Sequence, residues 1–179
     1  MIERDRYPDI EPGTKRAKNW VTGLSLYFLG MGIQAGYAID PVIKQEIDDW
    51  PDPFTFLFSV INGPRMAIQK KDGLVRYLGQ KAEVRADVEM CIKNPEFAFM
   101  LMVGQMSTQD AVAHNRQFVK GDLSQTLAVI RVMSRVQALL FPGFIAKNYI
   151  NRVPSFSWLI LRNRILLYGN CLLGAFQRN

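Results

Sequence analysis

The segment from Ala82 to Ile92 alternates apolar and polar residues without a break. The apolar positions are Ala82, Val84, Ala86, Val88, Met90 and Ile92, and the positions between them are Glu83, Arg85, Asp87, Glu89 and Cys91. Successive side chains of a β-strand point to opposite faces of its sheet, so this period of two predicts a strand with one buried and one solvated face. The chain must therefore cover one face of a sheet with a second layer, and Cys91 is expected on the solvent side.

Three further strands are expected before this one. Apolar residues alternate with Thr55, Leu57 and Ser59 over 54–60, which predicts a strand, and Asn62-Gly63 turns the chain into a second strand over 65–70. Lys71-Asp72-Gly73 is a hairpin signal and leads to a third strand over 74–78. With a fifth strand at 117–120, the sheet is expected to be five-stranded and mainly antiparallel.

Helices are expected to cover this sheet. Asn94 and Pro95 predict the start of a helix over 96–103, and Ser107 with Asp110 predicts a short one ending near His114. Asp122 and Gln125 predict the start of a longer helix that ends near Leu140. Its apolar face is expected to contain Leu123, Leu127, Ile130, Met133 and Leu140, opposite Ser124, Arg131 and Arg135. The predicted class is α+β, with helices on one face of the sheet.

Composition excludes most catalytic chemistry. The 179 residues include one histidine, His114, and two cysteines, Cys91 and Cys171, so neither a CxxC motif nor a histidine-rich metal site is expected. A Ser-His-Asp hydrolase would depend on His114 alone. Gly121-Asp122 is interpreted as a turn and helix cap. No catalytic residue, metal or cofactor is therefore predicted.

Residues 19–39 contain no charged side chain, which leaves two interpretations open. About 20 uncharged residues are enough to cross a bilayer, and Gly32 and Gly36 have the spacing of a close-packing helix motif. However, Thr22, Ser25, Gln34 and the glycines dilute the hydrophobicity, which favours an interfacial or domain-packed helix over a single transmembrane helix at 20–39. Asp40-Pro41 ends the run, and a short helix is expected over 42–49.

Charge is unevenly distributed along the chain. The formal net charge is +6, and no acidic residue follows Asp122. The basic residues beyond it lie among aliphatic side chains rather than among Gly, Ser and Asn, which favours an anionic lipid surface over nucleic acid as a partner. The residues expected to dock on a membrane are Lys147, Arg152, Trp158, Arg162 and Arg164.

The middle of the chain resembles the sterol carrier protein 2 (SCP2) family of lipid-binding domains. The resemblance covers about residues 54–141 and rests on the order and spacing of its elements. The segments that carry it are FLFSVING, IQKKDGLVRYLG, ADVEMCI, FAFMLMVGQMST and NRQFVKGDLSQTLAV. It implies a five-stranded sheet whose helices enclose an apolar tunnel for sterols, fatty acyl chains or other lipids, with no catalytic set.

The sequence pattern and the resemblance together nominate eight residues for this tunnel. They are Phe58, Phe97, Met102, Met106, Phe118, Leu127, Ile130 and Met133. Methionine adapts to ligands of varied shape, although methionine and phenylalanine at helical spacing also simply fill cores.

Four segments and two functions are expected. Residues 1–18 form a flexible lead-in, 19–49 a helical segment facing a membrane or partner, 54–141 the lipid-binding domain and 142–179 a basic helical extension. The predicted function is non-enzymatic binding and transfer or presentation of a sterol, fatty acyl or isoprenoid lipid, in the cytoplasm at a membrane surface. The alternative is an accessory subunit of a membrane-associated complex that binds no lipid.

Overall fold

A computed structural model of the chain describes residues 12–80, 83–102, 106, 108–140 and 169. Their helices and strands follow the predicted order, and most boundaries lie within one or two residues of those predicted. The elements are α1 (Pro12–Ile39), α2 (Pro41–Asp48), β1 (Phe54–Val60), β2 (Arg65–Lys71), β3 (Leu74–Gly79), β4 (Val88–Ile92), α3 (Pro95–Met102), α4 (Thr108–Ala113), β5 (Gln117–Lys120) and α5 (Leu123–Leu140).

The described residues form one sheet with the strand order β3-β2-β1-β4-β5. Three of the neighbouring pairs are antiparallel, but β1 and β4 are parallel. The expectation of a mainly antiparallel sheet is confirmed, and the sheet as a whole is mixed. After the two hairpins the chain returns to the free edge of β1, where β4 runs in the same direction as β1. The turn signals in the sequence do not reveal this parallel pairing.

The strand β4 is shorter than the alternation predicted. It begins at Val88, because the residues before it carry the chain from β3 back to β1. Asp87 ends this connection, where its carboxylate accepts a hydrogen bond from the Thr55 backbone N–H at 2.7 Å and its own N–H donates to the Thr55 carbonyl at 2.9 Å. The polar residues of the alternating segment therefore lie partly in the connection before β4 and partly in the strand itself.

The expectation of a solvent-facing Cys91 is wrong. Cys91 does lie on the face opposite Met90, but it is only 4% exposed. It lies between Ser59 of β1 and Phe118 of β5, its direct neighbours across the sheet. A small side chain in an inner strand is covered by larger neighbours, so alternation alone does not make it accessible.

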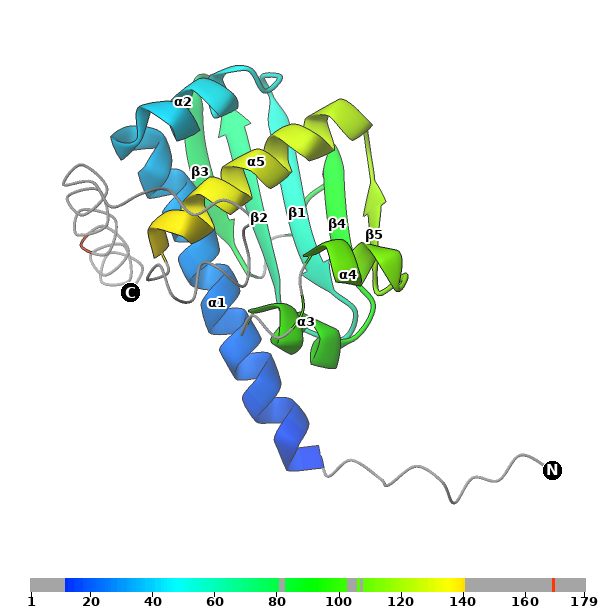
Figure 1. Ribbon diagram of the computed structural model, residues 1–179. Coiled ribbons are helices and arrows are strands. Elements are labelled where there is room, and N and C mark those ends of the chain that lie inside the picture. The colour runs from blue at the N-terminus through cyan, green and yellow to red at the C-terminus, as the bar shows by residue number, and fades with distance from the viewer. Residues whose placement is uncertain (1–11, 81–82, 103–105, 107, 141–168, 170–179) are drawn as a thin grey trace.

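The two faces of the sheet differ in what covers them. On one face, called the core face here, Phe56, Phe58, Ile68 and Met90 are almost fully buried. Figure 1 shows α5 crossing this face. The other face carries polar contacts between strands, such as Ser59 with Glu89. The predicted one-sided covering by helices is confirmed.

Helix α1 is part of this covering layer. It begins at Pro12, so residues 12–18 are helical where a flexible lead-in was expected, and residues 1–11 lie outside the description. Leu26, Leu29 and Ile33 of α1 are buried in the same core as the sheet. The domain-packed interpretation of residues 19–39 is therefore the one the structure supports, and none of the described helices is long and apolar enough to cross a membrane.

The glycines of α1 allow neighbouring elements to approach it closely. A Cβ atom added at Gly32 would lie 2.7 Å from Val136 Cγ1 of α5, and one at Gly36 would lie 2.7 Å from Ile43 Cδ1 of α2. The Gly32–Gly36 motif thus packs α1 against two helices of its own domain. This is the same close approach that the motif provides between helices in membranes.

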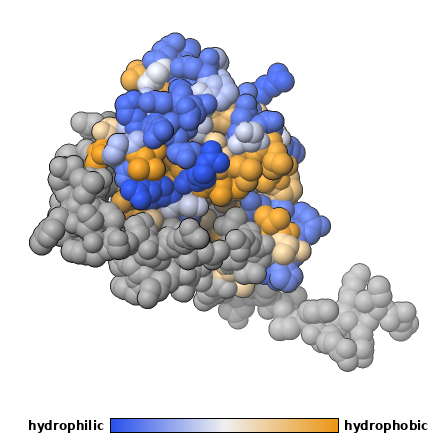
Figure 2. Space-filling view, turned by 45° about the horizontal axis from the view of Figure 1, so that its top comes forward, coloured by the Kyte–Doolittle hydropathy of each residue, from blue (hydrophilic) through white to orange (hydrophobic). Residues whose placement is uncertain are grey.

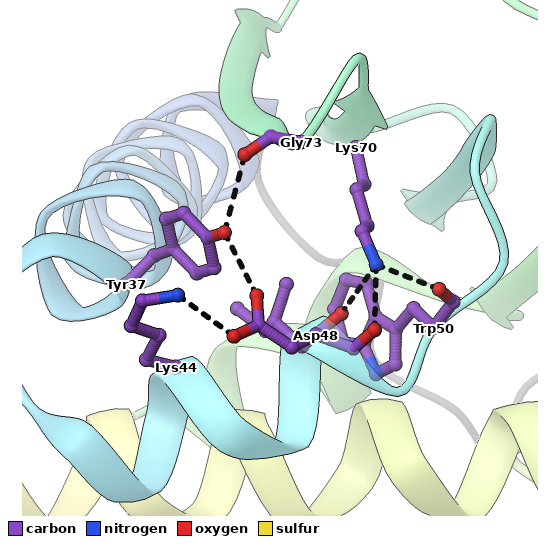
Figure 3. A network of polar contacts seen from close by, with 7 residues as sticks. Tyr37, Lys44, Asp48, Trp50, Lys70 and Gly73 are labelled. Atoms are coloured by element: carbon purple, nitrogen blue, oxygen red, sulfur yellow. Dashed lines mark hydrogen bonds and ion pairs between the residues drawn. The ribbon is translucent and has the colours of Figure 1, made fainter.

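A network of polar contacts joins α2 to the β2–β3 hairpin (Figure 3). The Lys70 ammonium of β2 donates hydrogen bonds to the backbone carbonyls of Ile47, Asp48 and Trp50 at 3.0, 2.8 and 2.7 Å. Lys70 is only 6% exposed. Because the last carbonyls of a helix have no partner within it, this buried cation satisfies the end of α2.

Tyr37 of α1 connects the same network to the hairpin. Its hydroxyl donates to the Asp48 carboxylate at 2.8 Å and lies 3.1 Å from the carbonyl oxygen of Gly73. Lys44 is 2.7 Å from the other Asp48 oxygen. The hydrogen bond from Lys44, with a smaller effect from Tyr37, lowers the pKa of Asp48. The hydrogen bond to Asp48 raises the pKa of Tyr37.

These pKa directions predict how the Asp48→Asn variant behaves with pH. A carboxylate with a lowered folded-state pKa stabilises the fold above its ordinary pKa of about 4, and loses this effect as the pH falls through the folded value. We expect Asp48→Asn to lower the melting temperature slightly at neutral pH and the difference from the parent to vanish in acid. Thermal unfolding at a series of pH values measures this. A difference that persisted in strong acid, where the Asp48 carboxylate is protonated, would show that the charge of Asp48 is not responsible.

Candidate functional site

A small apolar cavity lies between the core face of the sheet and helices α3 and α5. Its volume is about 20 Å³. Its apolar lining consists of Phe58, Met90, Leu101, Met102, Ile130 and Met133. Three polar residues, Gln117, Ser134 and Gln137, complete the wall. A space of this size holds about one water molecule.

Strand pairing brings the sheet side of this cavity together. Phe58 of β1 lies directly opposite Met90 of β4, so both side chains point to the core face. Gln117 of β5 lies opposite Ile92, two residues from Met90 on the same face. Leu101 and Met102 come from the end of α3, and Ile130 and Met133 from one side of α5. Three of the lining residues are methionines, whose unbranched side chains adapt to irregular spaces.

Gln117 is the most unusual residue of the cavity wall. It is 5% exposed, and its Oε1 atom is buried without a hydrogen-bond partner among the described residues. A buried polar atom without a partner costs about 1–3 kcal/mol. The nine lining residues include no Lys, Arg or His. The described part of the cavity wall therefore includes a side chain with a buried, unpartnered acceptor, and it includes no positively charged residue.

The structure gathers half of the predicted tunnel residues around this cavity. Phe58, Met102, Ile130 and Met133 all line it. Sequence reasoning missed Met90, Leu101, Gln117, Ser134 and Gln137. Met90 and Gln117 carried a usable signal, because each occupies the alternate position that points to the core face of its strand.

The other four predicted residues lie elsewhere. The Phe97 ring packs under the Arg116 guanidinium at 4.4 Å, and Met106 is buried with its sulfur 3.2 Å from Arg116 Nη1. Phe118 lies opposite Cys91 and therefore points to the other face of the sheet, beneath Lys120. Leu127 is 48% exposed. The residue type of Phe118 suggests a tunnel residue, but the alternation of its own strand places Gln117 on the core face instead.

Helix α5 is rotated relative to the predicted apolar face. Its buried residues include Val129, Val132, Val136 and Leu139, whereas Leu123 is 72% exposed. The helix has more apolar residues than one face can bury, so two orientations were available. The approach of Val136 to Gly32 requires the valine side to face α1, and this leaves Leu123 and Leu127 outward.

Exposed apolar residues gather beside the cavity. Figure 2 shows a hydrophobic area on the side of the molecule where α4, β5 and the start of α5 lie. The exposed residues of these elements are Val112, Val119, Leu123 and Leu127, called the exposed apolar side below. Val119 is two residues from Gln117 on the same strand face, and Leu127 precedes Ile130 by one helical turn. The exposed apolar side thus borders the cavity wall.

A second, more polar cleft lies where the β1–β2 turn meets α1 and α3. Its volume is about 430 Å³, and its walls include Asn62, Asn94 and Phe97. An ion pair between Lys18 and Glu96, 2.5 Å apart, crosses it. Lys93 also lines the cleft, so its described walls carry one more positive than negative charge.

The structure does not describe the residues nominated for membrane docking, and its described residues form no metal site. Lys147, Arg152, Trp158, Arg162 and Arg164 all lie outside the described residues. Within the described part of the chain, no group of three or more His, Cys, Asp and Glu residues is arranged to hold a metal ion. Asp122 has a structural role, because its side chain accepts a hydrogen bond from the Gln125 backbone N–H at 2.9 Å at the start of α5.

Comparison with known proteins gives similarities among solved structures only. No protein-family model matches the chain, and no curated protein matches it. A UbiJ-SCP2 ubiquinone synthesis protein is 14% identical, with a TM-score of 0.40, over 70% of this chain and 96% of that one. The sterol carrier protein domain 2 of Helicoverpa armigera is 17% identical, with a TM-score of 0.40, over 70% and 89%. Palmitated SCP2L2 from Aedes aegypti is 18% identical, with a TM-score of 0.37, over 57% and 90%.

Proposed function

We propose that this chain binds an apolar lipid between the core face of its sheet and helices α3 and α5, and transfers or presents it without chemical change. The observation that carries the proposal is the apolar cavity at this position, with its methionine-rich lining and the exposed apolar side next to it. The element order from β1 to α5 is also the one that the SCP2 resemblance implied. The proposal that the ligand is a lipid rests on the apolar lining of this cavity and not on catalytic residues.

Binding requires the cavity to enlarge. A volume of about 20 Å³ is far below that of a sterol or a long acyl chain. Met90, Met102 and Met133 can change rotamer at little cost, which moves apolar atoms out of the space between α5 and the sheet. Burial of apolar surface contributes about 25 cal/mol per Å², so a lipid that buries a few hundred Å² can offset this rearrangement.

The proposed entrance is the exposed apolar side, at a membrane surface. Val119 and Leu127 border the cavity wall, so a lipid can pass between membrane and cavity while remaining against apolar surface. The basic residues nominated beyond Leu140 would add attraction to anionic headgroups, at about 1 kcal/mol for each Lys or Arg near the surface. This attraction is screened by salt, so binding to anionic vesicles should weaken as ionic strength rises.

The proposal predicts that filling the cavity prevents lipid uptake. We expect the parent protein to take up lipid from phosphatidylcholine vesicles that contain cholesterol, a long-chain fatty acid and a prenyl alcohol. Ile130→Trp should reduce this uptake at least tenfold, because the indole occupies the space beside Met133. Mass spectrometry of the re-isolated protein measures the bound lipid.

Ser124→Trp provides the matched control for this substitution. Ser124 lies on the same helix, is exposed and is not part of the exposed apolar side, so its replacement should leave uptake within about twofold. Ser134→Phe fills the same cavity from another position, and circular dichroism checks that each variant is folded. Equal uptake by the parent and both folded cavity variants would exclude this cavity as the lipid site.

The small cavity volume also supports a second function, that of an accessory subunit which binds no lipid. In that case the exposed apolar side would pack on a partner protein of a membrane-associated complex. Retention on membranes that is insensitive to salt, together with no lipid uptake, would favour this second function.

A further inference from the structure

The buried oxygen of Gln117 indicates the chemistry of the ligand. Gln117 Oε1 is an acceptor, is fully enclosed and has no hydrogen-bond partner among the described residues. It belongs to a side chain that lines the apolar cavity. A buried acceptor without a partner is retained at a stability cost, and a ligand that donates a hydrogen bond to it recovers that cost on binding.

The charge of the cavity wall further restricts which headgroup the ligand can carry. The described residues that line it are apolar or uncharged, and no cation lies among these described residues. An ionised carboxylate or phosphate would lose its hydration there without gaining a positive partner, which strongly disfavours an anionic headgroup. A hydroxyl group is neutral and donates a hydrogen bond. Ser134 and Gln137, in the same wall, can accommodate its oxygen.

We infer that the cavity selects an uncharged lipid that carries a hydroxyl group, such as a sterol or a long-chain or prenyl alcohol, and that Gln117 accepts the hydrogen bond from this hydroxyl. The inference rests on the proposed function, because it specifies the ligand of that same site. It distinguishes these alcohols from free fatty acids, whose carboxylate is ionised at neutral pH.

Three ligands that each contain a linear chain of twelve carbon atoms test the inference. Dodecanol has the hydroxyl donor, methyl dodecyl ether lacks it, and dodecanoate carries a negative charge. Titrations are followed through the methyl NMR signals of Met90, Met102 and Met133, which line the cavity. We expect the parent protein to bind dodecanol about tenfold more tightly than the ether, the difference that one hydrogen bond provides. Dodecanoate should also bind more weakly than dodecanol, because its carboxylate loses hydration in the cavity.

The Gln117→Leu variant identifies the acceptor. It keeps a side chain of similar size and removes the oxygen, so it should bind dodecanol and the ether with equal affinity. Gln45→Leu, an exposed position on α2, is the matched control and should keep the parent's preference. If Gln117→Leu does not fold, the three-ligand comparison on the parent still decides the ligand class.

Each other outcome overturns the inference in a distinguishable way. Equal binding of alcohol and ether by the parent would refute a hydroxyl-selective site while leaving lipid binding intact. Tightest binding of dodecanoate would have the same meaning. A preference that survives in Gln117→Leu would remove Gln117 as the acceptor. If none of the three ligands moved the methionine signals, both this inference and the proposed function would fail.

Discussion

Replacing Lys70 with methionine is expected to lower the free energy of unfolding by about 2–4 kcal/mol. The Lys70 ammonium is buried and donates to three backbone carbonyls at the end of α2, all within 3.0 Å. Methionine keeps most of the apolar stem and loses all three hydrogen bonds. The Trp50 carbonyl loses its Lys70 donor, whereas the Ile47 carbonyl keeps the backbone N–H of Trp50 at 3.0 Å. Urea unfolding of the parent and the variant measures the difference.

The neighbouring lysine provides the control. Lys71 is exposed at the end of the same strand, so Lys71→Met should change stability by no more than about 0.5 kcal/mol. If the two variants lost similar stability, the effect would come from removing a positive charge in the hairpin and not from the capping of α2.

The Gly32→Ala substitution should lower the free energy of unfolding by about 1–3 kcal/mol, although alanine is the better helix former. The new methyl group would lie 2.7 Å from Val136 Cγ1 and 3.2 Å from Leu140 Cδ1. Helix α5 would then have to move away from α1, which disturbs the layer that covers the sheet. Thermal or urea unfolding measures the loss.

Two further variants separate this clash from a general effect of glycine replacement. At Gly23 the nearest atoms to an added Cβ are 3.5 Å away, so Gly23→Ala should be stabilising by up to about 1 kcal/mol. Combining Gly32→Ala with Val136→Ala removes the clashing methyl groups, so the double variant should lose less than the sum of the single variants. Additive losses would contradict a direct contact between Gly32 and Val136.

The sequence was sufficient to predict most of the fold because the local signals agree with one another. The alternation over 54–60, the turns at Asn62-Gly63 and Asp72-Gly73, and the caps at Asn94 and Asp122 each match an observed boundary. The parallel pairing of β1 with β4 was not predicted, because it depends on a connection that crosses the sheet. The sequence alone does not decide how α1 packs, because an uncharged helix with glycines fits a membrane as well as a domain core.

The site was less predictable because it depends on which face each side chain occupies. Phe118 and Leu127 were nominated as apolar residues near the expected tunnel, but strand register and the rotation of α5 direct both away from it. Gln117 was overlooked because a polar residue does not suggest an apolar cavity. The alternation of β5 predicts the face on which Gln117 lies. That its Oε1 atom has no hydrogen-bond partner among the described residues is evident only from the structure.

The most direct test of lipid binding is mass spectrometry of organic extracts from the purified protein, beside the native mass of the intact chain. We expect one lipid per chain, uncharged and hydroxylated, and its loss from the Ile130→Trp variant. A protein that carries no lipid and takes none up from vesicles would contradict the proposed function and would favour the accessory-subunit function.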